Sequence, residues 1–525
     1  MSLRKDGADG SRPFQRVLIA NRGEIAVRII RACREMGMEA VAVYSDADVA
    51  AAHVRLADVA VRIGGPAAID SYLREDALVA AAIAAGAEAI HPGYGFLAER
   101  ASFARAIEAA GLAFVGPSST VIETLGDKLN ARRIARDAGV PIVPGTLEPA
   151  QVDRPDQVES LLAAAEEVGF PLLVKASAGG GGRGMRRVEA ARELPAALAA
   201  GSREAAASFG DGSVYLEREI SRARHIEVQL LGDATGAVVA IGERDCSLQR
   251  RHQKLVEEAP APGLSDGERL RLHELAVRVG SAAGLRNVAT VEFLRDRDGS
   301  LHFLEVNTRL QVEHGITELV TGLDIVREQF WLAAGRPLSP DARRAAERSA
   351  SPFGHAIEVR LSAEHPGRDF APAPGTISRW RMPDGPGVRV DTAIESGERV
   401  SPEYDNLIAK VMVYGPDRAA AIDRLRRALG ETEIAGIQTT LPFDRFVATA
   451  PSFIAGDLST TWVVDHWDGR AEFVRAAADA QLAAGLAASA EPSATSSPRG
   501  RSGGGSSDGR WRRLGLEAAT NRWPR

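Results

Sequence analysis

Cysteine is nearly absent from this sequence of 525 residues, in which only Cys33 and Cys246 occur. Two cysteines give no basis for a disulfide framework or for a zinc site built from cysteine ligands. Long apolar runs are also missing: none approaches the ~18 residues of a membrane span, and the polar residues 1–15 lack the apolar core of a signal peptide. We therefore expect a soluble protein of the reducing cytoplasm, with no membrane partner.

An excess of either charge is missing as well. The chain has 64 basic and 70 acidic residues and a net charge of -6, so no basic field would attract nucleic acid. Outside the serine- and glycine-rich tail, the Gly-x-Ser-x-Gly, His-Glu-x-x-His and Cys-x-x-Cys motifs are absent, which disfavours serine hydrolase and zinc protease chemistry. We expect any anion to be bound by a local cluster, and no nucleic acid partner.

The first part of the chain alternates strand-like and helical runs, at 17–20, 24–36, 40–44, 76–85 and 113–116. Such alternation predicts a parallel sheet covered by helices on both faces. The turn at 21–24 follows the first strand but lacks the Gly-x-Gly-x-x-Gly spacing. We therefore do not expect a nucleotide at that turn.

Later segments differ in character. Residues 214–330 mix strands with a helix near 266–283, and residues 350–470 are strand-rich before they end in helix and loop. From 471 the chain passes into serine- and glycine-rich sequence, which has too little apolar surface to offset the entropy lost on ordering and predicts a flexible tail. At about 150 residues per domain we expect about three domains.

A glycine-rich segment follows the strand-like run 172–174. Lys175 ends that run, and glycine occupies positions 179–182 and 184. Glycines let successive N–H groups point at phosphate oxygens, and Lys175 would supply the counter-charge. The spacing is not that of a Walker loop. On this motif alone, a phosphate-binding loop and a disordered glycine loop with a solvated lysine are equally supported.

Polar residues occupy every other position from 305 to 313, namely Glu305, Asn307, Arg309, Gln311 and Glu313. In an extended conformation they share one face, so the pattern predicts a half-buried strand. Two carboxylates, two amides and a guanidinium on one face match a divalent metal, a triphosphate and a small anion. Phosphate transfer is the working hypothesis.

Glu292 lies in a second strand-like run, 290–294, which the turn signal at 296–299 separates from the run at 301–304. These runs predict a hairpin that brings Glu292 and Glu305 together. With the oxygen of Asn307 they suit Mg²⁺ or Mn²⁺, because hard cations prefer oxygen donors. The alternative is an exposed pair of glutamates, which would repel each other.

Residues 246–254 concentrate hydrogen-bond donors and one imidazole, that of His252, and contain few apolar side chains. Taken alone, such a stretch is most often solvated. We therefore interpret it, in the absence of other observations, as a solvated basic turn.

Taken in order, the motifs at 20–28, 91–97, 126–128, the glycine loop, 243–247, 249–258 and 307–314 resemble those of the biotin carboxylase component of biotin-dependent carboxylases. The resemblance covers residues 16–465 and implies an α/β fold of the ATP-grasp type. The implied parts are a doubly wound parallel-sheet domain at 14–125, an ATP-grasp domain at 126–330 with a glycine-loop lid at about 150–215, a C-terminal α+β domain at 345–465, and a disordered tail at 471–525.

The resemblance also implies a role for each candidate site residue. ATP would be bound by Lys128, Lys175, Gly180, Gly181, Gly182, Met185, Glu217, His225, Gln249 and His252. The metal would be held by Glu292, Glu305 and Asn307. Bicarbonate would be positioned by Lys254, Arg309, Gln311 and the Val312 backbone, with Glu313 as its base, and Arg360 would stabilise the biotin enolate.

The implied reaction explains these residue types. Bicarbonate is a poor nucleophile until a base removes its proton, and phosphoryl transfer needs metal and cationic stabilisation. The implied carboxyphosphate breaks down to CO₂ and phosphate, and the biotin enolate attacks CO₂. Arginine suits that oxyanion because it stays charged and donates in a planar fork.

The chain departs from the family pattern at two places. Arg218 stands where lysine is common, which bears on the adenine contact, and Gly315 with Ile316 stands where Pro-Val is frequent. No Glu-Ala-Met-Lys-Met biotinylation motif occurs. We therefore expect biotin to arrive on a separate carrier protein, with a separate carboxyltransferase subunit, and we expect a homodimer.

We expect the biotin carboxylase subunit of an acyl-CoA carboxylase, for acetyl-CoA or propionyl-CoA, with pyruvate or urea as alternative acceptors. Another ATP-grasp ligase, which activates a carboxylate for an amine, would not need Arg360 or the cluster at 252–254. A catalytically silent assembly subunit would not need the charged residues that are intact here: Lys128, Lys175, Glu292, Glu305, Arg309, Glu313 and Arg360.

Overall fold

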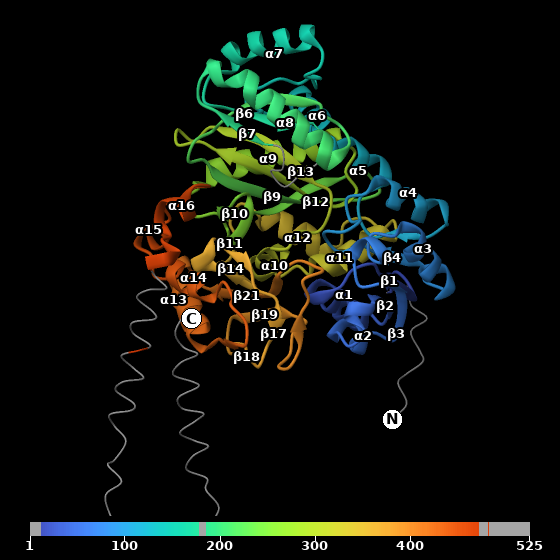
Figure 1. The fold of residues 1–525 in the computed structure, drawn as a ribbon. Coiled ribbons are helices and arrows are strands. Elements are labelled where there is room, and N and C mark those ends of the chain that lie inside the picture. The colour runs from blue at the N-terminus through green and yellow to red at the C-terminus, as the bar shows by residue number, and fades with distance from the viewer. Residues whose placement is uncertain (1–11, 178–184, 472–480, 482–525) are drawn as a thin grey trace, which may run out of the picture.

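The computed structural model describes residues 12–177, 185–471 and 481, and all contacts below refer to these residues. In Figure 1 the N-terminal unit, in blue, and the C-terminal unit, in orange, flank the lower part of the molecule. A green unit that carries α7 and α8 lies at the top. The predicted tail and residues 178–184 of the glycine loop fall outside the described residues.

The N-terminal unit is a parallel sheet of five strands in the order β3-β2-β1-β4-β5. Its first strand has Val17, Leu18 and Ile19 at 0% exposure, as expected where helices cover both faces. This confirms the predicted doubly wound sheet. The strands are β1 (Arg16–Ile19), β2 (Glu39–Ser45), β3 (Val59–Gly64), β4 (Ala89–His91) and β5 (Ala113–Phe114). The helices are α1 (Gly23–Glu35), α2 (Ala52–Leu56), α3 (Glu75–Ala84), α4 (Ala101–Ala109) and α5 (Ser119–Gly126).

The turn between β1 and α1 is fixed by contacts within the protein. The Asn21 amide donates to the carbonyls of Pro92 and Tyr94, each at 2.7 Å. Arg22 pairs with Asp48 at 2.6 Å. Both side chains at this turn are therefore engaged in holding the N-terminal unit together.

The lid unit is a small antiparallel sheet in the order β7-β6-β8, with two helices. Its core includes Leu161, Leu172, Val174, Leu198 and Leu216. The elements are α7 (Pro155–Val168), β6 (Leu172–Ala176), β7 (Arg186–Val188), α8 (Leu194–Phe209) and β8 (Val214–Arg218).

The centre of the molecule is one sheet of eight strands in the order β13-β12-β9-β10-β11-β14-β21-β19, paired antiparallel throughout. Five strands come from the segment 224–307, and three come from the segment 355–415. The strands are β9 (Arg224–Gly232), β10 (Val238–Arg250), β11 (Gln253–Ala259), β12 (Asn287–Arg295), β13 (Leu301–Asn307), β14 (His355–Ser362), β19 (Val388–Thr392) and β21 (Leu407–Gly415). The sheet therefore runs without a break across the predicted boundary near residue 345.

Five helices lie before or between the strands of the central sheet in the sequence. These are α6 (Lys128–Asp137), α9 (Asp266–Ala282), α10 (His314–Thr321), α11 (Ile325–Ala333) and α12 (Pro340–Arg348). Helix α9 starts with a capping box, in which the Ser265 side chain accepts from Glu268 N and the Glu268 side chain accepts in return. The predicted helix near 266–283 is thus confirmed.

The C-terminal unit adds short strands and four helices to β14, β19 and β21. Its core packs Leu361, Val411, Ile422, Leu425 and Trp462 together. The remaining elements are β15 (Glu364–His365), β16 (Ala371–Pro372), β17 (Gly375–Thr376), β18 (Arg379–Arg381), β20 (Arg399–Val400), β22 (Glu433–Ala435), α13 (Arg418–Glu431), α14 (Leu441–Val447), α15 (Pro451–Ala455) and α16 (Trp462–His466). Strands followed by helices match the prediction for 350–470.

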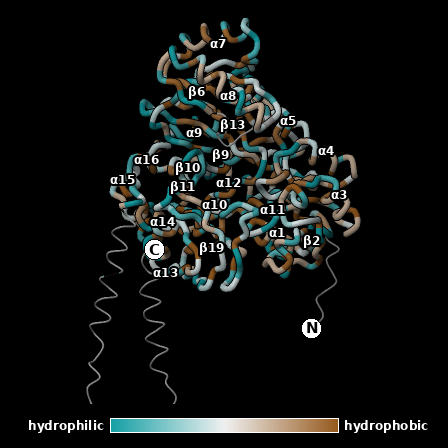
Figure 2. Tube along the Cα trace, in the orientation of Figure 1, coloured by the Kyte–Doolittle hydropathy of each residue, from teal (hydrophilic) through white to brown (hydrophobic). Residues whose placement is uncertain are grey.

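Hydrophilic and hydrophobic residues are mixed along the visible helices and strands (Figure 2). Among the described residues, no helix has the length and apolar character that a membrane crossing requires.

Candidate active site

The predicted hairpin is present and places two carboxylates opposite each other. β12 pairs antiparallel with β13, and Glu292 is the partner of Glu305. Glu292 is 3% exposed, and burial, followed by repulsion from Glu292, raises the pKa of Glu305. The amide of Asn307 donates to Glu292 at 2.7 Å. A buried and a half-buried acidic group that repel each other, beside an amide oxygen, fit a hard divalent cation.

The predicted strand over 305–313 is wrong beyond Asn307, where β13 ends. The following residues leave the sheet because their backbone binds elsewhere: Thr308 N donates to Glu99, and the Lys410 ammonium donates to the Val312 carbonyl at 2.8 Å. The polar side chains still converge. Arg309 donates to Asn307 at 3.2 Å and to Gln311 at 3.0 Å.

Lys254 stands at the centre of three buried carboxylates. Its Nζ lies 2.5 Å from Glu227, 2.8 Å from Glu292 and 2.8 Å from Glu313. Burial alone would lower the pKa of Lys254, but these carboxylates raise it well above its ordinary value. The ammonium is therefore held charged in the interior.

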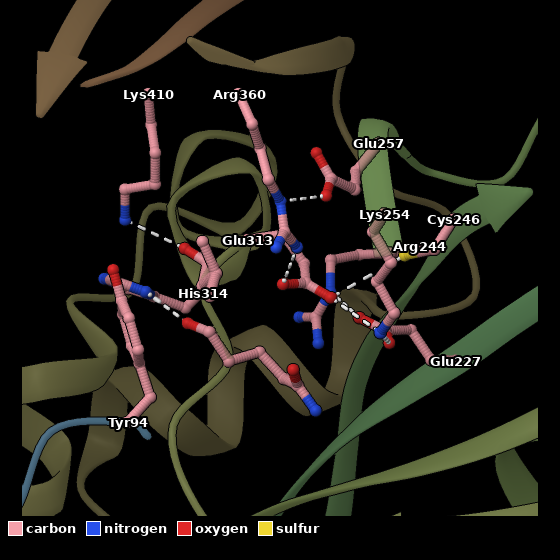
Figure 3. Close-up of polar contacts among 12 residues, drawn as sticks. Tyr94, Glu227, Arg244, Cys246, Lys254, Glu257, Glu313, His314, Arg360 and Lys410 are labelled. Atoms are coloured by element: carbon pink, nitrogen blue, oxygen red, sulfur yellow. Dashed lines mark hydrogen bonds and ion pairs between the residues drawn. The ribbon is translucent and has the colours of Figure 1, made fainter. Parts of the chain in front are cut away.

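Glu313 joins Lys254 to Arg360, as Figure 3 shows. Arg360 Nη2 donates to one oxygen of Glu313 at 2.9 Å, and Lys254 donates to the other at 2.8 Å. Arg360 Nε donates in turn to Glu257 at 2.6 Å. Burial would raise the pKa of Glu313, but Lys254, Arg360 and Arg244 outweigh burial and hold it well below the ordinary value.

The donor atoms of two groups of described residues lie close enough to ligate a metal: His225, Glu227 and Glu292, and Glu227, Cys246 and Glu313. Lys254 already contacts Glu227, Glu292 and Glu313. Its ammonium thus supplies the positive charge between these groups, so neither replaces Glu292, Glu305 and Asn307 as the candidate metal site.

The side toward the lid carries two further lysines. Lys175, on β6, forms a buried ion pair with Glu217 on β8. Arg132 also contacts Glu217, at 2.5 Å. Lys128 begins α6 and is half-buried, and burial lowers its pKa while Glu305 acts in the opposite direction. Lysine charge is therefore concentrated between the lid and the central sheet.

Three more predicted residues lie near this side of the sheet. His225 contacts Glu292 at 2.9 Å, and Gln249 Nε2 lies 3.4 Å from His225 Nδ1. Burial would lower the pKa of His225, but Glu292 raises it overall. His252 is exposed on the turn between β10 and β11.

The interpretation of 246–254 as a solvated turn is wrong. Cys246, Ser247 and Gln249 are buried on β10, and β11 begins at Gln253. Only two residues form the turn: Arg251 and His252 have φ of 49° and 66°. Positive φ at both central residues is the geometry of a tight hairpin turn that follows the twist of the strands. Polar residues are buried here because they face the site.

The described residues bring most of the predicted site together. Met185 is half-buried immediately before β7, whereas Gly180, Gly181 and Gly182 lie outside the described residues. The residues that sequence reasoning missed are Glu99, Glu227, Arg244, Glu257 and Lys410. Alternation offered one signal, because His225, Glu227 and Gln229 occupy every other position of β9, within the segment 214–330 that is predicted to contain strands.

Comparison with known families matches most of the chain. Residues 13–122 match the biotin carboxylase N-terminal domain, and residues 358–465 match the biotin carboxylase C-terminal domain. Residues 127–340 match the ATP binding domain of the carbamoyl-phosphate synthase L chain. The chain belongs to the biotin carboxylase family. As a biotin carboxylase it is a ligase of the ATP-grasp type, as the resemblance implied.

Similar biotin carboxylases and related chains come from several organisms. The biotin carboxylase of Nostoc sp. is 47% identical over 86% of this chain and 98% of its own. A pyruvate carboxylase subunit of Methanothermobacter thermautotrophicus is 46% identical over 87% of this chain and 91% of its own. The biotin-dependent acyl-coenzyme A carboxylase alpha3 subunit of Mycobacterium leprae is 46% identical over 87% of this chain and 75% of its own.

Solved biotin carboxylase structures share the fold. The biotin carboxylase domain dimer of Hydrogenobacter thermophilus 2-oxoglutarate carboxylase, in complex with MgADP, ADP and bicarbonate, has a TM-score of 0.82 and 44% identity over 86% of this chain and 98% of its own. The biotin carboxylase of Campylobacter jejuni, in complex with β,γ-ATP, has a TM-score of 0.82 and 41% identity over 86% of this chain and 99% of its own.

Proposed function

We propose that this chain uses ATP, bicarbonate and Mg²⁺ or Mn²⁺ to carboxylate biotin that is carried on a separate protein. The observation that supports this most directly is the chain of contacts from Lys254 through Glu313 to Arg360, buried beside the lysines of the lid side. It combines a base, cations for a small anion and an arginine that faces the base. A solved relative is described with MgADP and bicarbonate.

Glu313 is the proposed base for bicarbonate. Lys254, Arg309, Gln311 and the Val312 backbone position that anion, since they supply positive charge and hydrogen bonds on one side of Glu313. With both cations turned to Glu313, its lowered pKa makes it a weak base. When bicarbonate draws Lys254 toward itself, the pKa of Glu313 rises and the base becomes active. Biotin that draws Arg360 away raises the pKa of Glu313 further, so biotin stimulates the reaction.

Arg360 is proposed to bind two partners, one after the other. In this structure it donates to Glu313 and Glu257. During biotin carboxylation it would donate to the ureido oxygen of biotin as negative charge develops there. A guanidinium suits that position because it stays charged and presents a fixed fork of donors.

The nucleotide is proposed to lie between the lid and the central sheet. Lys128 and Lys175 would contact its phosphates, with Gly180, Gly181, Gly182 and Met185 of the lid above them. Glu217, His225, Gln249 and His252 would line the remaining wall. Glu292, Glu305 and Asn307 would hold the metal, which neutralises phosphate charge during phosphoryl transfer.

A direct assay tests the proposed reaction. The purified protein is expected to cleave ATP in a manner that requires Mg²⁺ and bicarbonate and that free biotin stimulates, because the site provides for all four. Phosphate release is measured with each component left out in turn, and carboxybiotin is measured directly. ATP cleavage that ignores both bicarbonate and biotin would favour the alternative ATP-grasp ligase.

The final acceptor is proposed to be acetyl-CoA or propionyl-CoA, in a homodimeric subunit that works with a biotin carboxyl carrier protein and a carboxyltransferase. A relative named as an acyl-coenzyme A carboxylase subunit supports this, while relatives named for pyruvate and 2-oxoglutarate keep other acceptors open. The domain limits and a cytoplasmic location stay predictions. Isolation of this chain from the native host tests the proposed acceptor. A biotinylated protein and a carboxyltransferase that acts on acyl-CoA are expected to be isolated with it. Recovery of a carboxyltransferase that acts on pyruvate or urea instead would contradict the proposal.

A further inference from the structure

Two buried glutamates face each other beside Arg360 and are not used by the proposed reaction. Glu257 on β11 is the direct cross-strand partner of Glu358 on β14. Both are 0% exposed. Glu358 and Arg360 are two residues apart on the same strand, so their side chains leave the sheet on the same face. The pair and the arginine therefore belong to one buried cluster.

The cluster has more acceptors than donors. Glu257 Oε1 accepts from Arg360 Nε at 2.6 Å. Within the described residues, the other oxygen of Glu257 and both oxygens of Glu358 have no hydrogen-bond partner. The nearby cation Lys410 already contacts the Val312 carbonyl at 2.8 Å and Glu24 at 3.1 Å. Arg360 is thus the one cation seen to contact the pair in the part of the chain that the structure describes.

Two ionised carboxylates in this arrangement would repel strongly. Directly opposite side chains in an antiparallel pair have Cβ atoms only about 4.5–5.5 Å apart, and a dry interior screens charge poorly. Burial is the largest cause that raises the pKa of Glu257 to about 7 and the pKa of Glu358 well above its ordinary value. Such neighbours titrate as a unit rather than as two separate acids.

We propose that Glu257 and Glu358 share a single proton and together form the anchor that positions Arg360 for the biotin half-reaction. The proposal rests on the proposed function, which assigns the biotin oxyanion to Arg360. The protonated pair carries one negative charge, which balances the single positive charge of the guanidinium. Arg360 Nε is then fixed at Glu257, while Nη2 remains available to Glu313 or to biotin.

Loss of the shared proton changes this balance. A second negative charge would draw Arg360 toward the pair and away from the biotin oxygen, so biotin carboxylation is expected to decline at alkaline pH. Other charged or titratable groups act on the pair from neighbouring elements: Lys254 of β11, Glu313 before α10, Lys410 of β21, Tyr94 after β4, Cys246 of β10 and Asp444 of α14. They are common to the wild type and to the variants below.

The test uses Glu358→Gln, Glu257→Gln and the double variant. If one proton is shared, either glutamate alone can carry the single charge. Each single variant should keep biotin-dependent carboxylation within about threefold, whereas the double variant should lose about 100-fold or more, which exceeds the roughly tenfold product of the single losses and is a non-additivity of the size known for coupled neighbours. In Glu358→Gln the alkaline decline should move to higher pH or disappear. Arg360→Ser gives the reference for complete loss.

Two readouts separate positioning from a general structural effect. Bicarbonate-dependent ATP cleavage without biotin should change less than about threefold in all three variants, because the pair acts only through Arg360. Glu328→Gln is the matched control, since Glu328 is a buried carboxylate that accepts from Ser339 N at 3.0 Å on α11. Additive losses in the double variant, an unchanged pH profile in Glu358→Gln, or equal losses of ATP cleavage would overturn the proposal.

A measurement on the wild type serves if a variant does not fold. Infrared spectra should show the carbonyl band of a protonated carboxylic acid at pH 7, which weakens as pH rises together with biotin-dependent turnover. If Glu358→Gln folds, the difference between its spectra at pH 7 and at alkaline pH should lack that band. A band that does not titrate with turnover would contradict the shared proton. An absence of any bicarbonate-dependent ATP cleavage would instead overturn the proposed function, and the infrared result would still report on the pair.

Discussion

Glu313→Gln is expected to lower bicarbonate-dependent ATP turnover by roughly 10²- to 10⁴-fold, the usual contribution of a general base. Glutamine keeps the shape of the side chain but cannot take a proton from bicarbonate. It also cannot carry the charge that Lys254 and Arg360 contact from either side. Steady-state phosphate release with saturating bicarbonate measures the loss.

Nucleotide affinity should change little in this variant, because the proposed nucleotide contacts of Lys128 and Lys175 do not involve Glu313. ATP binding is followed by calorimetry under the same conditions. Glu328→Gln, which removes a buried carboxylate on α11, controls for the general cost of such a change. Near-normal turnover in Glu313→Gln would show that another group removes the proton.

Lys254→Met should destabilise the fold by about 3–5 kcal/mol at neutral pH, as expected when one partner of a buried ion network is removed. Methionine fills a similar volume but leaves Glu227, Glu292 and Glu313 without their shared ammonium. Catalytic activity should be lost as well, since the same ammonium is proposed to position bicarbonate. Unfolding is measured by denaturant titration at several pH values.

The loss of stability in Lys254→Met is expected to depend on pH. In the wild type the pKa values of Glu292 and Glu313 are lowered in the folded state, so their stabilisation is present above the unfolded value of about 4.3 and is lost as pH falls through the folded values. Without Lys254 the folded pKa values should rise. The deficit of the variant should therefore be largest at neutral pH and shrink toward acid pH.

Lys254→Arg is the matched variant, because it keeps the positive charge while it changes the shape. It should recover part of the stability at neutral pH. A deficit of the same size at every pH in Lys254→Met would assign the effect to packing rather than to charge.

Local patterns predicted those parts of the site that depend on nearby sequence. The hairpin that pairs Glu292 with Glu305 followed from two strand-like runs and a turn signal, and the structure has it in that register. The parallel sheet of the N-terminal unit followed from alternation of strands and helices. The hairpin strands are neighbours in the chain, and the strands of the parallel sheet all lie within one continuous segment, residues 16–114.

Features set by distant contacts could not be predicted. β13 ends at Asn307 because Glu99 and Lys410, more than ninety residues away on either side, bind the backbone that follows. Lys254 contacts Glu227 and Glu313 only because β9 and β11 belong to one sheet and the loop before α10 packs against it. The buried stretch from Cys246 to Gln249 resembled a solvated turn, since its polar residues are stabilised by partners that a local pattern does not reveal.

The unbroken central sheet limits how this enzyme can be divided or recombined. Arg360 belongs to β14, and β14 pairs directly with β11, which carries Lys254 and Glu257. A cut near residue 345 would expose β11 as a long unpaired edge, a feature that promotes aggregation. A chimaera between two carboxylases would therefore have to exchange residues 224–415 as one piece, so that every strand of the sheet keeps the neighbour with which it pairs.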